Sequence, residues 1–240
     1  MLTVVCGMPW EMQILEAIFP ADVVKLTGSA KIGLSSLVPR NCNRILSFGL
    51  SGGLSQKIAV ADIAIASSLT DGPNVWTPDQ KWRRAIQDSA TMLTMPRTGD
   101  MGSQYDTEPV SWNFLTCPWY SSDQMDLADT ATQRADLLTK TGAWSIDDES
   151  IYVAKLAADR NIPFAIVRSC SDDASETLPL AARGTIMNSA GGANLSYLFQ
   201  TLKTEPWAQT LALGKVELDF NASLTSLAAA GTALMPALLG

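Results

Sequence analysis

The sequence predicts an α/β fold with three layers, α/β/α, built around a mixed and largely parallel twisted sheet. Short β-branched runs alternate along the chain with longer segments of helical period, which is the pattern of strand-helix-strand units. The chain has 240 residues, of which 47% are hydrophobic, enough to bury the core of one large domain. We therefore interpret residues 1–240 as a single domain.

The first third of the chain begins with a strand-helix-strand pattern. Four runs have the β-branched and apolar composition of strands: Leu2–Cys6, Val23–Leu26, Arg44–Gly49 and Ile58–Ala66. Trp10–Ile18 has a helical period between the first two strands. Between the last two strands, Gly49–Gly53 reads G-L-S-G-G and predicts either a tight turn or a close approach of the backbone to a ligand. It is not a dinucleotide fingerprint, because the glycine spacing differs and an apolar run follows.

The middle of the chain is predicted to hold mainly loops and edge strands. Residues 71–120 are rich in Trp, Pro, Ser, Thr and Gly, and Thr77–Leu93 has a helical pattern among them. A further helix is expected at Ala128–Thr141, because Gly142 provides a stop signal at its end.

The clearest strand-helix-strand unit follows Gly142. Strands are expected at Ala143–Asp147 and Pro163–Val167, and Glu149–Arg160 between them has the apolar period of a helix. Such a unit predicts a parallel strand pair with a right-handed crossover. Ligands in such sheets bind beyond the carboxyl ends of the strands. Polar and acidic residues stand at these two ends: Asp147, Asp148, Glu149, Ser171, Asp172 and Asp173.

Composition excludes several kinds of chemistry. The chain has no histidine, so a Ser-His-Asp triad and a histidine-ligated metal are excluded, and we expect neither a metal nor an organic cofactor. A net charge of −7 and a pI near 4.6 argue against a nucleic-acid partner, since a phosphate backbone requires clustered Lys and Arg. The four scattered cysteines indicate reduced thiols, and the first strand lacks the features of a signal peptide, so a cytoplasmic protein is expected.

The apolar C-terminal run, Ser223–Leu239, is interrupted by polar residues, glycine and proline. These interruptions make it a poor membrane span. It predicts a helix that packs on the domain or lies at a membrane surface, so peripheral membrane contact stays open.

The acids at the strand ends have two interpretations. Asp147, Asp148 and Asp172 could each cap a following helix, which is the usual role of an acid at a strand end. They could also form part of a site, since buried neighbouring acids raise each other's pKa values. The residues alone do not decide between these roles.

Three motifs, taken in chain order, resemble those of the nucleoside phosphorylase and nucleosidase family. They are G-L-S-G-G-L at 49–54, I-D-D-E-S at 146–150 and V-R-S-C-S-D-D-A at 167–174, and the resemblance covers nearly the whole chain. Within the family the chain is most similar to the hopanoid-associated phosphorylases, which are assigned the removal of adenine from adenosylhopane. The segments that carry this similarity read A-D-L-L-T-K-T-G-A, S-E-T-L-P-L-A-A and L-F-Q-T-L-K-T-E-P-W.

The resemblance implies cleavage of the N-glycosidic bond of a purine nucleoside. The expected substrate is a 5′-substituted adenosine such as adenosylhopane. Glu11 matches the family's water-activating glutamate, and Glu149 matches the glutamate that binds the ribose hydroxyls. Asp172 matches the aspartate that protonates the departing purine. This chemistry suits acids, because the sugar gains positive charge while the base gains negative charge.

Further residues of the motifs are expected to contribute to the pocket. Ser171 and the backbone of Gly52 are candidates for substrate binding, and Ser51 is either a substrate contact or a turn residue. Asp148 departs from the family, whose members usually have a methionine packed under the ribose at this position. A carboxylate there changes the sugar contacts, binds a new group or marks an altered activity.

The aromatic residue that stacks on the base in typical nucleosidases has no clear counterpart. Trp119, Tyr120 and Trp144 are candidates, although aromatic residues are more often part of the core. Trp10, Met8 and Met12 could form an apolar opening for the lipid tail of a lipid-linked nucleoside, or could pack in the core.

The choice between water and phosphate as nucleophile depends on cations, because a phosphorylase must hold a phosphate dianion. Ser47 stands where many phosphorylases of the family have an arginine, and Leu50 stands where many have a serine. Lys31 is either an anion contact or a surface lysine, and Arg168 is expected to be a structural ion partner of nearby carboxylates. We therefore favour hydrolysis, with phosphorolysis, in which phosphate is a co-substrate, as the alternative.

Two alternatives from other classes stay open. One is a catalytically altered nucleoside-binding homologue, for which Asp148 is the reason, and the other is a membrane-peripheral scaffold that uses the C-terminal helix. The resemblance also implies a homodimer or higher homo-oligomer, because in many relatives a neighbouring subunit completes the pocket.

Overall fold

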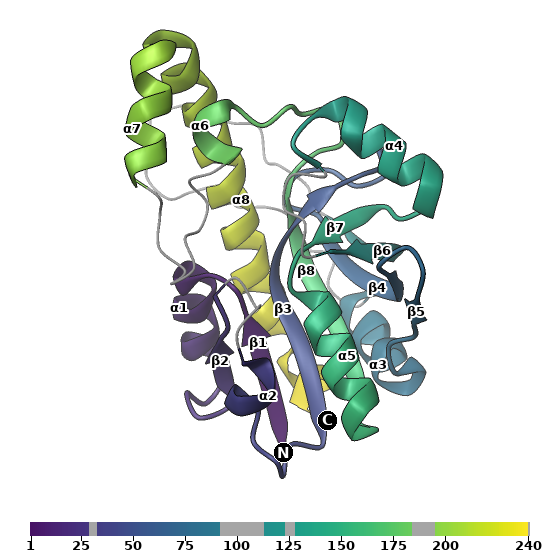
Figure 1. The fold of residues 1–240 in the computed structure, drawn as a ribbon. Helices are drawn as coiled ribbons and strands as arrows, with labels where there is room; N and C mark the ends of the chain where they lie inside the picture. The colour runs from purple at the N-terminus through teal and green to yellow at the C-terminus, as the bar shows by residue number, and fades with distance from the viewer. Residues whose placement is uncertain (29–32, 92–112, 123–127, 184–194, 240) are drawn as a thin grey trace.

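The computed structural model describes residues 1–28, 33–91, 113–122, 128–183 and 195–239, which fold around one mixed eight-stranded sheet (Figure 1). The strands are β1 (Leu2–Cys6), β2 (Val24–Leu26), β3 (Arg44–Gly53), β4 (Ile63–Thr70), β5 (Val75–Trp76), β6 (Phe114–Ser121), β7 (Ser145–Asp147) and β8 (Phe164–Asp172). The helices of the described residues are α1 (Pro9–Ile18), α2 (Leu34–Leu37), α3 (Gln80–Thr91), α4 (Ala131–Thr141), α5 (Ser150–Arg160), α6 (Leu180–Arg183), α7 (Leu195–Thr204) and α8 (Pro206–Leu239).

The sheet has the strand order β2-β1-β3-β7-β6-β4-β5, and β8 pairs with both β3 and β4. Parallel pairs predominate, as predicted: β1 with β2 and β3, β3 with β8, β4 with β6, and β6 with β7. The pairings β3-β8-β4-β6-β7-β3 form a closed ring, so this part of the sheet is curved like a small barrel.

Helices cover both faces of the sheet, which confirms the three layers (Figure 1). On one face α1, α3 and α8 contribute side chains such as Leu15, Ile86 and Leu234 to a buried apolar cluster. On the other face α2 and α5 contribute Leu34 and Val153 to a second cluster. The four cysteines are free and buried.

The glycine motif lies inside a strand rather than in a turn. β3 was expected to end at Gly49, but it continues to Gly53, with a register shift against β8 between Ser51 and Gly52. The interpretation of Gly49–Gly53 as a tight turn is therefore wrong. The chain turns only after Gly53. The following strand then begins at Ile63, and not at residue 58 as predicted.

The late start of β4 follows from a local turn. Ala61 has a left-handed backbone with φ 69°. The carboxylate of Asp62 accepts hydrogen bonds from the backbone N–H of Ala59 at 2.9 Å and of Asn113 at 2.8 Å. These contacts hold the turn closed up to Asp62, so the strand cannot begin earlier.

The predicted parallel pairing of the strands on either side of α5 is wrong. β7 pairs with β6 and with Gly52 and Gly53 of β3, whereas β8 pairs with β3 and β4. β3 lies between the two strands. The bulged end of β3 pairs with the short strand β7 on one edge, and β3 pairs with β8 on its other edge. Their carboxyl ends still meet, since Gly52 pairs with Ile146 on one side and with Asp172 on the other.

The middle of the chain differs in part from its prediction. The expected helix exists as α3, and β5 is an edge strand, but β6 lies inside the sheet between β4 and β7. Its buried residues Cys117 and Trp119 fit that interior position. The helix α4 agrees with its signals, because Thr130 caps its start and Gly142, with φ 68°, ends it.

The C-terminal helix begins earlier than its apolar run suggests. α8 has 34 residues, and its second half packs on the sheet through Ser223, Leu227 and Leu234. The Ser223 hydroxyl donates a 2.6 Å hydrogen bond to the carbonyl of Cys170 in β8. This half of α8 is therefore part of the domain core.

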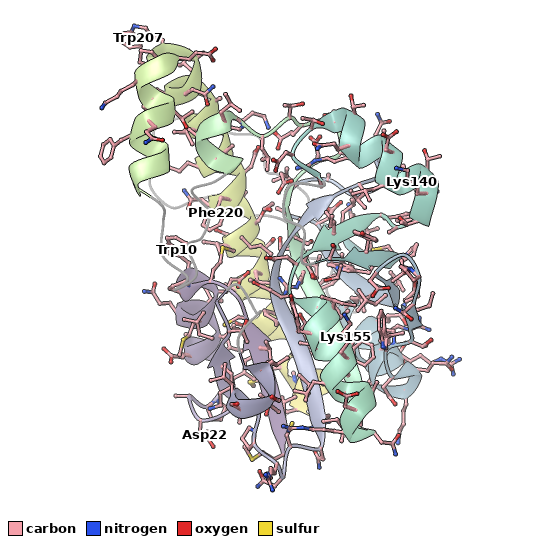
Figure 2. The ribbon with its side chains drawn as sticks, in the orientation of Figure 1. Trp10, Asp22, Lys140, Lys155, Trp207 and Phe220 are labelled. Carbon is pink, nitrogen blue, oxygen red and sulfur yellow. The ribbon has the colours of Figure 1, made fainter. Side chains whose placement is uncertain are left out.

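The first half of α8 extends beyond the sheet together with α7, where Trp207 stands at the far end (Figure 2). By length and composition α8 could cross a membrane, with a mean hydropathy of 1.5 over 18 residues. However, 39% of that stretch is buried in the protein, and core helices of soluble proteins meet the same criteria. This composition is weak support for a membrane span.

Candidate active site

A cavity of about 150 Å³ lies at the carboxyl ends of β3, β7 and β8, the edge at which the sequence predicts ligand binding. Its described walls also include the start of α1 and part of α4. All the site residues predicted from the sequence line this cavity: Glu11, Ser51, Gly52, Asp148, Glu149, Ser171 and Asp172. Lys31, the candidate anion contact, lies outside the described residues.

Glu11 enters the cavity from the first turn of α1, where an acid suits the positive end of the helix. Its side chain is fully buried. Its carboxylate accepts hydrogen bonds from the backbone N–H of Gly7 and Met8, each at 2.9 Å, and of Leu50 at 2.6 Å. Burial raises the pKa of Glu11, and the charge of Arg168 and the three N–H groups partly offset this rise. A raised pKa makes the carboxylate a stronger base near neutral pH.

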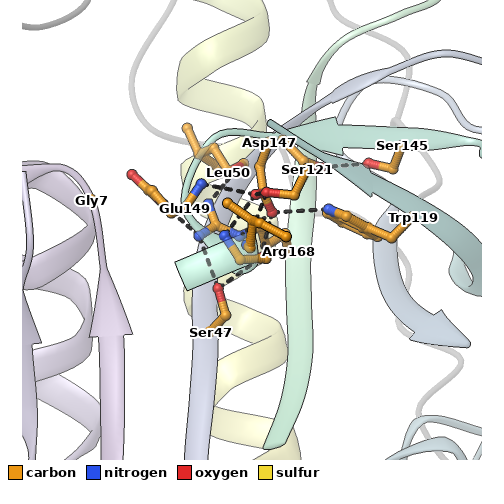
Figure 3. A network of polar contacts seen from close by, with 12 residues as sticks. Gly7, Ser47, Leu50, Trp119, Ser121, Ser145, Asp147, Glu149 and Arg168 are labelled. Carbon is orange, nitrogen blue, oxygen red and sulfur yellow. Dashed lines mark hydrogen bonds and ion pairs between the residues drawn. The ribbon is translucent and has the colours of Figure 1, made fainter. Parts of the chain in front are cut away.

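Arg168, on β8, connects three walls of the cavity (Figure 3). Its guanidinium is buried and forms ion pairs with Glu149 and, at 3.0 Å, with Asp147. It also donates hydrogen bonds to the carbonyl of Leu50 at 2.7 Å and to the hydroxyl of Ser47 at 2.9 Å. The predicted role of Arg168 as an ion partner of nearby carboxylates is confirmed.

Asp147 caps α5, as one of its two interpretations predicts. Its Oδ1 accepts hydrogen bonds from the backbone N–H of Glu149 at 3.0 Å and of Ser150 at 2.8 Å. Its Oδ2 accepts from the indole N–H of Trp119 at 2.9 Å and from the Ser150 hydroxyl at 2.5 Å. Both carboxylate oxygens are thus bound by the protein, so Asp147 positions the start of α5.

Glu149 follows at the N-cap position of α5 and is 3% exposed. Burial raises its pKa well above the usual value; Arg168 opposes this rise, and the charges of Glu11 and Asp148 add to it. We call Glu11, Asp147, Glu149 and Arg168 the Arg168 cluster. Three buried carboxylates share one guanidinium in this cluster.

Asp172 lies at the opposite wall, at the end of β8, and no described helix begins there, so its interpretation as a helix cap is wrong. Its Oδ2 forms an ion pair with Arg134 of α4, and its Oδ1 accepts a 2.6 Å hydrogen bond from the hydroxyl of Ser171. The side chain is 18% exposed, whereas that of Arg134 is 1% exposed. A cation, and not a closed apolar pocket, is therefore the main neighbour of this acid.

Arg134 is a residue of the site that the sequence motifs do not predict. Besides Asp172, its guanidinium donates to the carbonyls of Ala128 at 2.8 Å, Asp173 at 2.8 Å and Gly53 at 3.1 Å. The available signal was its position on the same helical face as Leu137 and Leu138, where an arginine is buried only if it has partners. We call Arg134 and Asp172 the Arg134 pair.

Each of the three acids to which the resemblance gives a role lies against a glycine. A side chain added at Gly7 would overlap with the carboxylate of Glu149, and one at Gly49 would overlap with that of Glu11. A Cβ at Gly52 would lie 3.0 Å from Oδ2 of Asp172. The glycines of the motif therefore make room for carboxylates, which explains glycine inside a regular strand.

The serines of the motifs are bound within the protein. Ser51 accepts a 3.0 Å hydrogen bond from the hydroxyl of Ser145, and Ser171 donates to the carbonyl of Ser51 at 3.1 Å as well as to Asp172. These contacts tie the ends of β3, β7 and β8 together. They favour a structural role for the Ser51 hydroxyl. The Ser171 hydroxyl stays in contact with Asp172.

None of the aromatic candidates lines the cavity. Trp119 is fully buried and Tyr120 is nearly so, while Trp144 packs under the ammonium of Lys57 at 4.5 Å. The lining within the described residues contains no aromatic side chain, and its apolar part includes Ile146 and Leu178. The structure therefore places these three aromatic residues in core or surface packing.

The charges of the cavity suit a neutral or cationic ligand. Both described guanidinium groups at the walls, Arg134 and Arg168, are already bound to carboxylates and carbonyls. Among the described residues, no group of His, Cys, Asp and Glu is arranged to hold a metal ion. The arrangement provides bases and acids on two walls, which suits proton transfer to and from a bound molecule.

Comparison with known proteins places this chain in a family. The family model described as "Phosphorylase superfamily" matches residues 29–202, most of the chain. The chain belongs to the phosphorylase superfamily. No curated protein sequence matches it. The matched region contains all three motifs that carry the resemblance.

Several solved structures have the same fold as this chain. The 5′-methylthioadenosine/S-adenosylhomocysteine nucleosidase of Neisseria meningitidis, in complex with methylthio-immucillin-A, is 13% identical with a TM-score of 0.63, and the match covers 99% of this chain and 97% of that one. The corresponding nucleosidase of Colwellia psychrerythraea, in complex with adenine, is 14% identical with a TM-score of 0.59, covering 94% and 95%. The futalosine hydrolase of Helicobacter pylori is 14% identical with a TM-score of 0.55, covering 90% and 96%. At this identity the likeness establishes the fold.

Proposed function

We propose that this member of the phosphorylase superfamily hydrolyses the N-glycosidic bond of a purine nucleoside, with adenine as the base. The observation that carries the proposal is the convergence of Glu11, Glu149 and Asp172 on one cavity from three distant parts of the chain. These are the three acids to which the sequence resemblance gives a role. The nucleosidases with the same fold, whose ligands include methylthio-immucillin-A and adenine, support the choice of substrate class.

The reaction assigns one step to each acid. As the bond between the sugar carbon C1′ and the base nitrogen breaks, the electron pair leaves with the base. Asp172, in its protonated form, supplies a proton to the purine and is left as the carboxylate that pairs with Arg134. Water attacks C1′ and gives its proton to Glu11, whose raised pKa suits this task. Glu149 holds the ribose hydroxyls, a contact that strengthens as positive charge develops on the ring. Arg134 holds Asp172 in place beside the base.

Water is favoured over phosphate because of the charge of the cavity. Ser47, which stands where many phosphorylases have arginine, holds Arg168 and Ser150 through hydrogen bonds of 2.9 Å each. Arg168 itself is neutralised by Asp147 and Glu149. A phosphate dianion would enter a cavity rich in carboxylates without a free guanidinium at its described walls, which is electrostatically costly.

We further propose a lipid-linked nucleoside such as adenosylhopane as the substrate. Met8 lines the cavity, and Trp10 follows two residues later in the chain. The Trp10 side chain is 42% exposed and packs edge-on against Phe220 of α8, with ring centroids 5.8 Å apart (Figure 2). Exposed apolar side chains continue along α7 and α8: Phe199, Trp207, Leu211 and Leu218. Such a surface suits contact with the membrane that would hold a lipid-linked substrate.

One experiment tests the reaction and the substrate together. The protein is incubated with adenosylhopane, methylthioadenosine and inosine, with and without phosphate, and the products are identified by chromatography. We expect free adenine and a free sugar at a rate independent of phosphate, with the highest kcat/KM for adenosylhopane. A sugar phosphate would contradict hydrolysis. Binding of nucleosides without any turnover would instead support an altered binding protein.

The variant Asp172→Asn keeps the shape of the side chain and removes the proton donor. We expect cleavage to fall at least about 100-fold, the usual contribution of a general acid. Asp159→Asn removes the same charge from an exposed position on α5 and serves as the control. Equal activity of both variants would contradict the role of Asp172.

Membrane contact and a homodimer are separate proposals. If the apolar surface on α7 and α8 binds membranes, a Trp207→Ser, Leu211→Ser double variant will lose most flotation with phosphatidylcholine vesicles and keep cleavage of methylthioadenosine. Unchanged flotation, or no flotation of the wild type, contradicts membrane contact. Sedimentation equilibrium tests the homodimer, and a mass of 25.7 kDa contradicts it.

A further inference from the structure

Asp148 differs from both acids beside it in the chain. Asp147 and Glu149 are bound by Arg168, and Asp147 also accepts hydrogen bonds from the start of α5. Within the described part of the chain, no other residue donates a hydrogen bond to the Asp148 carboxylate. Asp148 nevertheless lines the cavity. It is therefore a partly buried acid that faces the ligand space without a partner of its own.

The surrounding charges leave Asp148 without compensation. The groups around it are Asp147 at the end of β7, Glu149 at the start of α5, Glu11 on α1 and Arg168 on β8. Only Arg168 is positive, and it is already shared by Asp147 and Glu149 through ion pairs. When all are ionised, four carboxylates face one guanidinium. This part of the cavity therefore has an excess of negative charge.

No contact of the described residues gives this excess negative charge a structural role. Asp147 alone caps α5, and Arg168 keeps its hydrogen bonds to Leu50 and Ser47 without any contribution from Asp148. An uncompensated carboxylate destabilises the empty protein, because burial and the charge of Asp147 raise the pKa of Asp148 to about 6. A positive charge arriving in the cavity would relieve this cost.

We propose that Asp148 is a further catalytic residue, whose carboxylate stabilises the positive charge that develops on the sugar ring as the N-glycosidic bond breaks. This inference rests on the proposed function. During the step the bond electrons leave with the purine, the ring oxygen and C1′ share the positive charge, and water then bonds to C1′. Asp148 transfers no proton and stays ionised throughout. An interaction that exists only with the cationic sugar lowers the barrier without tightening the substrate complex.

The location of Asp148 supports this assignment. Glu149, the next residue, is the acid assigned to the ribose hydroxyls, and Glu11, assigned to the attacking water, is close enough to influence the pKa of Asp148. The base, by contrast, is assigned to the opposite wall, where Asp172 is neutralised by Arg134. The unpaired carboxylate therefore lies at the sugar end of the cavity, where positive charge forms.

The test compares two inhibitors of the same shape that differ in charge. One carries a protonated ring nitrogen in place of the ribose oxygen, and the other is its neutral carbocyclic counterpart. Calorimetry at pH 7.5 measures both dissociation constants for the wild type, for Asp148→Asn and for the surface control Asp159→Asn. We expect Asp148→Asn to lower the preference for the cationic inhibitor about 10-fold or more, the order of effect of one nearby charge. Binding of the neutral inhibitor should change less than about threefold.

Kinetics provide a second readout. Asp148→Asn should lower kcat at least as much as kcat/KM and leave KM for a neutral nucleoside nearly unchanged. A merely structural role would weaken both inhibitors equally and would overturn the inference. If the enzyme cleaves nucleosides and Asp148→Asn keeps the wild-type preference for the cationic inhibitor, the inference is overturned and the proposed function stands. If the wild type binds neither inhibitor and releases no base, the proposed function fails, and the inference fails with it.

Discussion

The two ends of the cavity use buried arginines in different ways. In the Arg168 cluster, three buried carboxylates share one guanidinium, and burial raises the pKa values of Glu11 and Glu149. In the Arg134 pair, one guanidinium serves a single, partly exposed acid and also binds backbone carbonyls. The Arg168 end is thus short of positive charge. At the Arg134 end one guanidinium faces one acid, so that end is positive while Asp172 holds its proton and balanced once the proton has been given up. The difference matches a reaction in which the sugar becomes positive and the base becomes negative.

The largest effect is expected from Arg168→Met. The substitution leaves three buried carboxylates without their cation, so the free energy of unfolding should fall by about 3 to 5 kcal/mol. Urea denaturation at neutral pH measures the loss. Arg160→Met is the matched control, because Arg160 binds the carbonyls of Ser35, Val38 and Pro39 but no acid of the described residues. Equal losses in the two variants would show that the carboxylates do not depend on Arg168.

Arg134→Met should cost less stability, about 2 kcal/mol, because Asp172 can still reach water. Its effect on nucleoside cleavage should be larger, about 100-fold, since Arg134 positions the acid. The measurement combines urea denaturation with a cleavage assay, repeated in an Asp172→Asn background. In that background Arg134→Met should have little further effect on the rate, and fully additive rate losses would contradict coupling between the two residues.

Asp148→Asn should stabilise the protein, in contrast to the two arginine variants. The folded pKa of Asp148 is raised from 3.8 to about 6, so folding favours the protonated form. The stability that this group contributes is complete below about pH 4 and is lost as the pH rises through about 6. Wild type and variant should therefore match near pH 4, and the variant should be up to about 3 kcal/mol more stable at pH 8. A constant difference across this pH range would contradict the sign of the shift.

The smallest effect is expected from Ser121→Ala. The Ser121 hydroxyl donates to Asp147 at 2.7 Å and accepts from the backbone N–H of Ile151 at 3.0 Å. Its loss leaves that N–H without this partner but leaves Arg168 in place, so we expect about 1 kcal/mol of destabilisation. Thermal denaturation measures it. A loss as large as that of Arg168→Met would mean that hydrogen bonds, and not the guanidinium, hold the Arg168 cluster.

The sequence predicts the local parts of this site well. The end of β7 at Asp147, the helix α5 and the position of Arg168 among acids follow from short-range patterns. The end of β8 does not, because this strand continues to Asp172, beyond its predicted end at Val167. Glu11 was linked to the other acids through the family resemblance, because nothing in its own segment indicates that Leu50 would donate to it. Its place in the cavity depends on contacts across the sheet.

Features that depend on residues far apart in the sequence could not be predicted, for the same reason. β3 continues through its glycines because β7 and β8 pair with its end, and no local signal in Gly49–Gly53 reports these partners. The partnership of Arg134 with Asp172 joins residues 38 positions apart. Each of these required tertiary pairing to be known.

The three glycine-acid contacts also constrain how this protein can diverge. Gly7 lies against Glu149, Gly49 against Glu11 and Gly52 against Asp172, and every pair joins distant segments. A gene that loses one of these acids no longer needs the matching glycine, whereas a gene that keeps the acid cannot replace the glycine without moving the carboxylate. Covariation of these positions among relatives would therefore separate active lineages from those that have abandoned the reaction.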